Sequence, residues 1–191
     1  MDTGPPGREH SLAEATWGVA FRDGRVHVVS RNRTAPLRDA APLVLQGEAS
    51  LSTNNTTAAI AAFVRAIRID PTLTNAYVGL GTALIRHHQA GEGLAAFRSA
   101  LDLEPRHANA RFHLAMALGA AGQLEEAILE MTTVTRFHPD HALAHERLAI
   151  WTYYVGRYTE AWVSVRSAER LGRSLPPQFL RLLERRSPDP N

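Results

Sequence analysis

The sequence predicts an all-α fold, a solenoid of three to four antiparallel helix pairs, and three observations lead to it. Proline recurs at a spacing of 34 residues, at Pro71, Pro105 and Pro139. Each proline follows an apolar-periodic run, and because proline cannot continue a helix, it ends one helix and begins the next. A leucine followed by a small residue recurs at the same spacing, in Leu80-Gly81, Leu114-Ala115 and Leu148-Ala149. A fixed period of this length is typical of stacked helical repeats, and a generic helical bundle would not produce it.

Composition excludes several classes of function. The chain has 191 residues, of which 45% are hydrophobic, and a net charge of +2; this suits one folded domain and argues against a general nucleic-acid coat. Cysteine and lysine are both absent, which removes disulfides, thiolate chemistry and Schiff-base lysines. We expect no signal peptide and no transmembrane segment. The expected location is the cytoplasm by default, and the periplasm if a signal peptide has been removed.

The period divides residues 40–173 into four repeats. Residues 74–107, 108–141 and 142–173 follow the pattern, with Arg173 in place of the last closing proline. Residues 40–73 have a good second half, but Pro42, Gly47 and a polar run predict a degraded or irregular first helix. Residues 174–191 are expected to form a capping helix and a tail, because the end of a solenoid must be covered. The residues predicted on the apolar face of this cap are Leu175, Phe179, Leu182 and Leu183.

Residues 1–39 are predicted to be an N-terminal extension that contains a β-hairpin at 16–30. Asp23-Gly24 lies between two runs of alternating apolar residues, which is the strongest short hairpin signal. A two-residue turn places Trp17, Val19, Phe21, Val26 and Val28 on one face. An isolated hairpin is marginally stable in water, so this face must dock. Two interpretations stay open: a cap on the first repeat, or an arm that docks on another protein.

The phased pattern resembles the tetratricopeptide repeat family over about residues 57–172. The resemblance implies a right-handed superhelix in which the first helix of each pair lines a concave groove that binds polypeptides. The groove positions that it implies are Asn75, Val78, Thr82, Ile85, Arg86, Asn109, Phe112, Met116, Gly119, Ala120, Leu143, Glu146, Ile150, Tyr153 and Tyr154. Relatives that grip acidic chaperone C-termini use phased Lys and Asn residues. Here those positions hold Val78, Thr82, His113 and Leu143, so a carboxylate clamp of that kind is not expected.

We expect this groove to bind a partner polypeptide without any enzymatic reaction. Phe112, Met116 and the residues around Tyr153 would form an apolar patch of the kind that marks interaction sites. Asn75 and Asn109 share a phase, where amides are placed to bond the backbone of an extended peptide. The alternative is that Phe112 and Met116 are core residues, or are covered by the N-terminal segment.

A histidine-rich cluster and an arginine-rich end point to two other functions. His138, Asp140, His141 and His145 cluster, with His141 and His145 one helical turn apart, but no third ligand or general base is evident. Asp140 is expected to cap the next helix instead, and we expect no metal and no cofactor.

Residues 157–186 contain seven arginines against three glutamates. The plainer interpretation is a solvated face. The alternative is an accessory subunit of a larger complex, membrane complexes included, which docks through the hairpin and this Arg-rich end. Specific nucleic-acid binding is not expected, because no aromatic residues are interleaved with the arginines.

Overall fold

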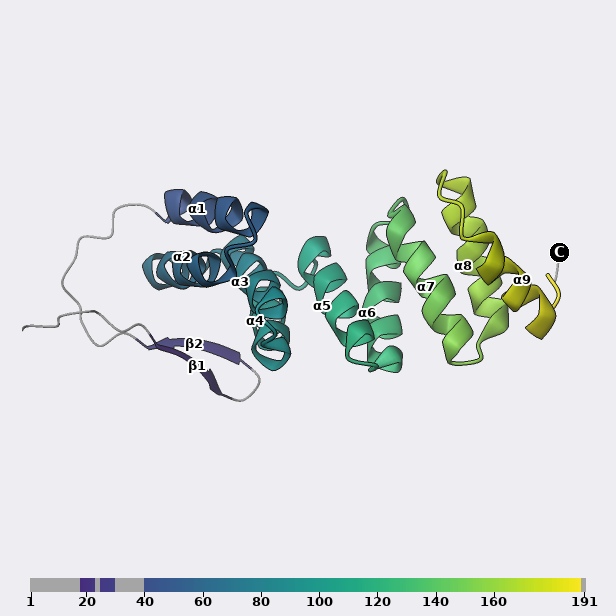
Figure 1. Cartoon of the computed structure of the whole chain (residues 1–191), viewed down its shortest axis with the longest axis horizontal. Helices are drawn as coiled ribbons and strands as arrows, with labels where there is room; N and C mark the ends of the chain where they lie inside the picture. The colour runs from purple at the N-terminus through teal and green to yellow at the C-terminus, as the bar shows by residue number, and fades with distance from the viewer. Residues whose placement is uncertain (1–17, 23–24, 30–39, 190–191) are drawn as a thin grey trace, which may run out of the picture.

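The computed structural model describes residues 18–22, 25–29 and 40–189, which form a helical solenoid preceded by a β-hairpin (Figure 1). The elements are β1 (Gly18–Arg22), β2 (Arg25–Val29), α1 (Ala41–Ser52), α2 (Thr56–Ile69), α3 (Thr74–Arg86), α4 (Ala90–Leu103), α5 (Ala108–Ala120), α6 (Leu124–Phe137), α7 (Ala142–Tyr154), α8 (Tyr158–Arg170) and α9 (Pro177–Arg186). The helices α1 to α8 pack as four consecutive antiparallel pairs, each pair packs on the next, and α9 packs on α8. The predicted all-α solenoid is therefore confirmed. No helix in the described residues is long and apolar enough to cross a membrane.

The turn inside each pair uses one repeated backbone conformation. The angle φ is +57° at Asn54, +62° at His88, +78° at Gly122 and +79° at Gly156, and these positions are 34 residues apart. After each of them, the next N–H donates to a carbonyl five residues earlier, for example Gln123 to Leu118 at 3.0 Å. This bond closes the first helix of the pair, as in a Schellman motif. Glycine reaches positive φ without strain and asparagine tolerates it, whereas His88 has a Cβ that opposes it.

The core repeats one large side chain against one small residue. The large residues come from the second helices at a common phase, and they are Phe63, Phe97, Met131 and Val165. The small residues come from the first helices at a common phase, and they are Gly47, Gly81, Ala115 and Ala149. A Cβ at Gly47 would lie 2.6 Å from Cζ of Phe63, and one at Gly81 would lie 2.6 Å from Cε1 of Phe97. Glycine thus faces phenylalanine, and alanine shares a core cluster with the smaller Met131 or Val165, so volume is balanced along the stack.

The first helix of the first pair is regular, which corrects the prediction of an irregular segment. Pro42 lies in the first turn of α1, where its missing N–H costs no helical hydrogen bond. Gly47 does not break the helix, because it is buried beneath the ring of Phe63. The glycine serves close packing between helices rather than a turn.

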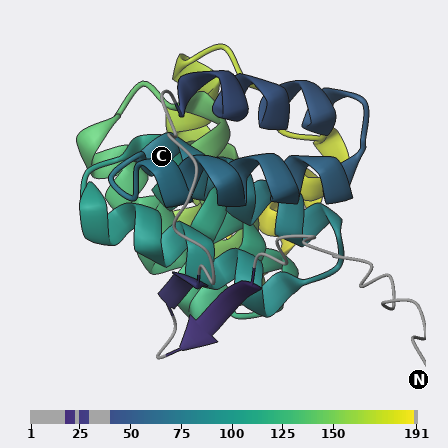
Figure 2. The same ribbon diagram turned by 90° about the vertical axis from the view of Figure 1, so that its left-hand side faces the viewer.

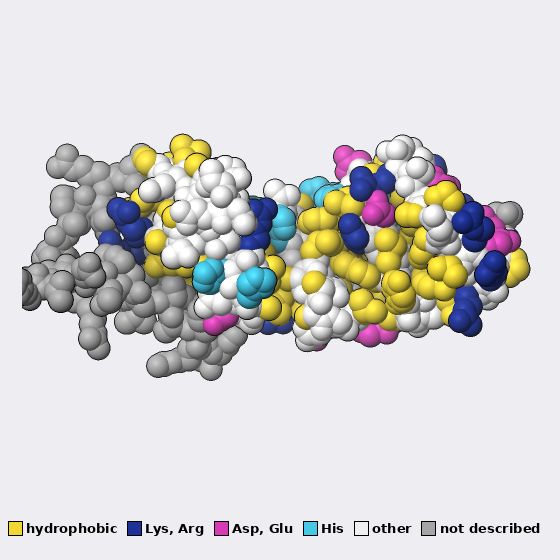
Figure 3. Space-filling view, in the orientation of Figure 1, with side chains coloured by type: hydrophobic (Ala, Val, Ile, Leu, Met, Phe, Trp, Pro, Cys, Tyr) yellow, Lys and Arg dark blue, Asp and Glu magenta, His cyan; other side chains and the backbone are white. Residues whose placement is uncertain are grey.

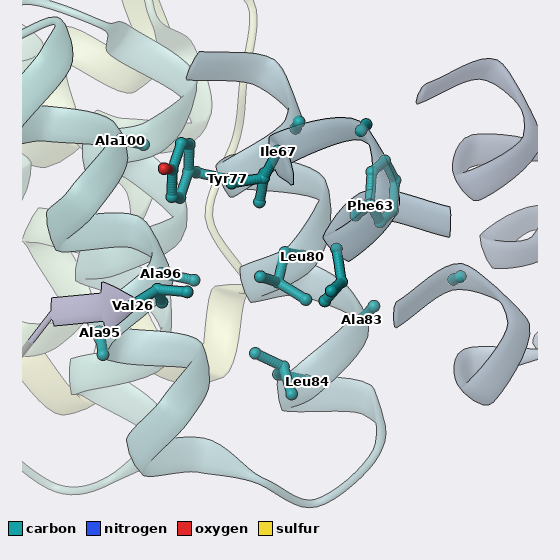
Figure 4. Packing of buried hydrophobic residues seen from close by; sticks show 14 of the residues in the cluster. Val26, Phe63, Ile67, Tyr77, Leu80, Ala83, Leu84, Ala95, Ala96 and Ala100 are labelled. Atoms are coloured by element: carbon teal, nitrogen blue, oxygen red, sulfur yellow. The ribbon is translucent and has the colours of Figure 1, made fainter. Parts of the chain in front are cut away.

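The N-terminal hairpin has the predicted register and packs on the solenoid. Arg22 pairs with Arg25, Phe21 with Val26, and Val19 with Val28. Figure 1 and Figure 2 both show the hairpin on the side of α2 that faces away from α1. The buried side chain of Val26 lies against Ala95 and Ala96 of α4 (Figure 4). Trp17 lies outside the described residues, as do the side chains of Val19, Phe21 and Val28.

The last helix covers the end of the stack. Leu175 and Leu183 are buried against α8, and Phe179 is half-buried there. The indole N–H of Trp162 donates to the Ser187 carbonyl at 2.9 Å, which ties the end of α9 to α8. Leu182 was predicted on the buried face, but it is 47% exposed. The prediction for Leu182 is wrong because α9 rotates so that Leu183, not Leu182, enters the core.

Candidate binding face

The residues predicted from the repeat pattern lie on α3, α5 and α7, and we call the surface that these helices form the first-helix face. Its exposed members are Asn75, Arg86, Asn109, Ala120 and Tyr154. Its half-buried members are Val78, Thr82, Ile85, Phe112, Met116, Gly119, Leu143, Glu146, Ile150 and Tyr153. Figure 3 shows hydrophobic side chains gathered over α5 and α7, with basic side chains toward α9.

A histidine at the start of α5 orients the amide of Asn75. The Nδ1 atom of His107 accepts the backbone N–H of Ala110 at 3.1 Å and thereby caps α5. Because Nδ1 is an acceptor, the proton of the neutral ring is on Nε2, which lies 3.1 Å from Oδ1 of Asn75. His107 therefore donates to the amide oxygen of Asn75, and the amide NH₂ group points away from it. The bond between His107 and Asn75 links two repeats, and it leaves the two N–H donors of the Asn75 amide on the surface.

The same histidine recurs one repeat later beside an aromatic ring. His141 caps α7 by accepting the N–H of Ala144 at 3.2 Å, so its Nε2 also carries the proton. Its ring stacks on Phe112, with centroids 4.9 Å apart and planes 25° from parallel. Within the described residues, the Nε2–H of His141 has no hydrogen-bond acceptor. Phe112 and His141 therefore offer an apolar surface and a donor side by side.

A tyrosine cluster lies at the C-terminal end of the face. The ring of Tyr153 is 5.4 Å from that of Phe179 on the capping helix and 5.7 Å from that of Tyr158. Tyr154 meets Tyr153 edge-on at 5.6 Å and is 70% exposed. Tyr153 thus supports the cap, whereas Tyr154 is available for contact.

The first-helix face carries an excess of positive charge. The helices α3, α5 and α7 contain Arg86, Arg111 and Arg147 but a single acid, Glu146. Arg111 is paired with Glu130 of α6 and adds no net charge, so the excess rests on Arg86 and Arg147. Glu146 is engaged by Arg173 and lies near Arg147. Arg86 donates to the Leu51 carbonyl at 2.9 Å, so its charge is held at the edge of the face. An incoming segment with negative groups is favoured by this balance.

One histidine of α5 has a shifted pKa. Burial lowers the pKa of His113 from its usual 6.5, and the nearby Arg86 lowers it further. The ring stacks on Phe97, at 5.8 Å between centroids. The neutral ring is therefore part of the packing beneath the face.

Two histidines of the cluster weighed as a metal site, His141 and His145, are engaged by the backbone. Nδ1 of His141 faces the Ala144 N–H, and Nε2 of His145 lies 3.0 Å from the Pro139 carbonyl. No group of three or more His, Asp or Glu side chains suited to a metal ion occurs among the described residues. The expected cap at Asp140 is wrong, because the N-cap of α7 is His141.

Sequence reasoning missed the role of the two capping histidines. His107 and His141 are 34 residues apart, and this spacing was the available signal. Histidine is not among the residues preferred at a helix N-cap, so the pattern of side-chain preferences alone does not indicate it.

Comparison with known proteins agrees with the helical-repeat fold. Two models of the tetratricopeptide repeat match the chain, one over residues 84–149 and the other over residues 40–73. None of the curated proteins matches the sequence.

Several solved structures are similar in fold. The MamA crystal structure superposes with a TM-score of 0.66 at 20% identity, over 70% of this chain and 78% of that chain. The pilF protein of Pseudomonas aeruginosa gives 0.69 at 19% identity, over 76% and 68%. The first tetratricopeptide domain of Spaghetti (RPAP3), bound to an HSP90 peptide, gives 0.61 at 18% identity, over 65% and 99%. At these identities the likeness concerns the fold alone. The repeat matches, the 34-residue phase and the paired helices show that the chain belongs to the tetratricopeptide repeat family.

Proposed function

We propose that the first-helix face binds an extended segment of a partner polypeptide. The observation that carries the proposal is the stacking of the half-buried Phe112 ring on His141, a side chain with an N–H donor that is unused among the described residues. Phe112 lies against His141, whose Nε2–H has no acceptor in the described part of the chain, and Tyr154 is largely exposed. Aromatic residues of this kind dominate binding energy at interfaces.

The polar groups suit the backbone of such a segment. Asn75 presents its amide NH₂ group because His107 holds its oxygen. Backbone carbonyls of an extended peptide would accept from these donors, which gives affinity with little demand on the peptide sequence. The arginines of the face favour a segment that also carries acidic side chains. The proposal involves no chemical reaction.

The test is a native pull-down with the full chain from the source organism, read by mass spectrometry and followed by titration of the partner recovered. The variant is Phe112→Glu with Tyr154→Glu, since Tyr153 is needed for the cap. Each anchor is expected to contribute about 2 kcal/mol, so the partner should be lost. The matched control is Leu45→Glu on α1, where the leucine is 65% exposed and lies outside the face. A partner retained by the double variant would overturn the proposal.

A second candidate function rests on the C-terminal end. Arg181, Arg185 and Arg186 are exposed on α9, beside the exposed Leu182. This surface suits an acidic subunit of a larger assembly, and the hairpin contributes less because Val26 is already buried on α4. Arg181→Glu with Arg185→Glu should remove such a partner while leaving first-helix-face binding unchanged.

A further inference from the structure

The docked hairpin shows how the outer side of a second helix holds an extended strand. Ala95 of α4 is only 5% exposed, whereas Ala61, at the same phase of α2, is exposed. Ser99 accepts the backbone N–H of Val26 at 3.1 Å and donates to the Ala95 carbonyl at 3.1 Å. Arg25 pairs with Asp102 at 3.1 Å. The helix therefore offers the strand an apolar position, a hydroxyl acceptor and a charge, at i, i+4 and i+7.

The helix α6 repeats these three features one unit later, with nothing over them in the part of the chain that the structure describes. Leu129 replaces Ala95 and is 66% exposed. Thr133 replaces Ser99, and its hydroxyl donates to the Leu129 carbonyl at 3.0 Å, just as Ser99 bonds Ala95. No donor among the described residues bonds to the hydroxyl oxygen of Thr133. Arg136 occupies the position equivalent to Asp102 and carries the opposite charge.

In the next helix, the hydroxyl acceptor is already used by an arginine. At the same phase α8 has Val163, which is 53% exposed, and Ser167. The hydroxyl of Ser167 donates to the Val163 carbonyl but already accepts from Arg170 at 3.1 Å. The backbone of an incoming strand would have to share that oxygen with Arg170, so α6 is the better site.

The charge at α6 selects the occupant. The guanidinium groups of Arg106 and Arg136 lie 5.2 and 4.9 Å from the ring of Phe137. No carboxylate pairs with either arginine among the described residues. The hairpin of a second copy would bring Arg25 against Arg136, which is unfavourable.

We propose that the outer side of α6 is a second docking surface, which takes an extended strand of a partner protein. The strand places an apolar side chain over Leu129, donates a backbone N–H to Thr133, and carries an acidic residue opposite Arg136. This surface is separate from the first-helix face, so the failure of one docking proposal would not affect the other.

The chain itself supplies the probe. A fluorescent, cyclised peptide of residues 16–30 is titrated against the full-length protein in two forms, native and with Arg25→Glu. Cyclisation holds the hairpin together, since an isolated hairpin is marginally stable. The α4 site is already covered by the hairpin of the protein and repels a glutamate through Asp102.

The Arg25→Glu peptide is expected to bind about fivefold more tightly than the native peptide, the scale of one exposed ion pair. Arg136→Glu in the protein should reverse this order, and Leu129→Glu should abolish binding of both peptides. Leu45→Glu, at an equally exposed leucine, should change nothing, and circular dichroism melts check that each variant folds. Equal affinities for the two peptides, or binding that survives Leu129→Glu, would overturn the proposal.

Discussion

The ring of Phe63 lies directly over Gly79, so that a Cβ on this glycine would come within 2.3 Å of Cζ. The same ring covers Gly47 on the other side, at 2.6 Å. Phe63 of α2 is thus held between the backbones of α1 and α3, and it joins the first repeat to the second.

Gly79→Ala should destabilise the protein. Alanine favours a helix over glycine by about 1 kcal/mol, but overpacking against a buried ring costs about 1–3 kcal/mol. The free energy of unfolding, from urea titration, is expected to fall. Gly91→Ala in α4 is the control, because no atom lies within 4 Å of a Cβ there, and it should stabilise. Equal changes in unfolding free energy for both variants would contradict the inference that Phe63 packs closely on Gly79.

If large and small core residues balance each other, substitutions at Met131 and Ala115 should have non-additive effects on the free energy of unfolding. Met131→Phe alone overpacks the third repeat and should cost about 1–3 kcal/mol. Ala115→Gly alone should cost about 1 kcal/mol through helix propensity. Together they recreate the pair seen at Phe97 and Gly81, so the double variant should be more stable than the sum of the two predicts, by about 0.5–3 kcal/mol. Strict additivity in a double-mutant cycle would count against volume balance.

His88→Gly should raise stability. His88 holds φ at +62° in the turn where later repeats have glycine, and a Cβ in this region costs about 1–2 kcal/mol. Part of that gain is lost to the greater freedom of glycine in the unfolded chain, so a net increase of about 1 kcal/mol is expected. Thermal and urea unfolding both measure it. Gly122→Ala should show the opposite sign.

His107 should contribute to stability through its cap. His107→Ala removes the acceptor for the Ala110 N–H and should cost about 1 kcal/mol, whereas His107→Asn retains a capping oxygen and should cost little. The asparagine is too short to hold Asn75 at the same place, so the two variants separate the cap from the link between repeats. Amide hydrogen exchange at Ala110 reports the cap directly; unchanged protection in His107→Ala would exclude the role given to Nδ1.

Stability should fall in acid partly through His113. Burial lowers the pKa of His113 in the folded protein below the usual 6.5, so the unfolded chain binds more protons in that range. The stability that the neutral ring supplies is therefore complete above about pH 6.5 and is lost as the pH falls from there through the lower folded value. His113→Gln should flatten this part of the profile of unfolding free energy between pH 8 and pH 5. An identical slope in both proteins would show that His113 does not titrate with folding.

The repeat period was enough to predict the solenoid, because proline and the Leu-small pairs report local helix ends and packing faces. It could not explain Gly47, whose role depends on a ring from another helix. Residue preferences at helix starts indicated Asp140, yet His141 caps α7. The choice between Leu182 and Leu183 depends on the rotation of α9 against α8, which amphipathic spacing does not determine.

For the candidate site, the sequence predicted the positions of the residues but not their hydrogen bonds. The family pattern predicted which positions share a face, and the structure places those residues on α3, α5 and α7. The polar chemistry of that face was not predictable in the same way. The tautomer of His107, and with it the free donors of Asn75, follows from a capping bond that only the three-dimensional arrangement reveals.

The bond between Val26 and Ser99 joins positions 73 residues apart, in a chain whose helices otherwise pack mostly on their sequence neighbours. Short-range packing forms quickly, while closing a long loop must wait for both ends to exist. During synthesis the strand leaves the ribosome first, but its seat on α4 is complete only when Asp102 has followed. The strand is therefore made before its binding site and can be placed only after α4 has formed, so a ribosome-bound chain that stops before α4 would leave this strand without its site.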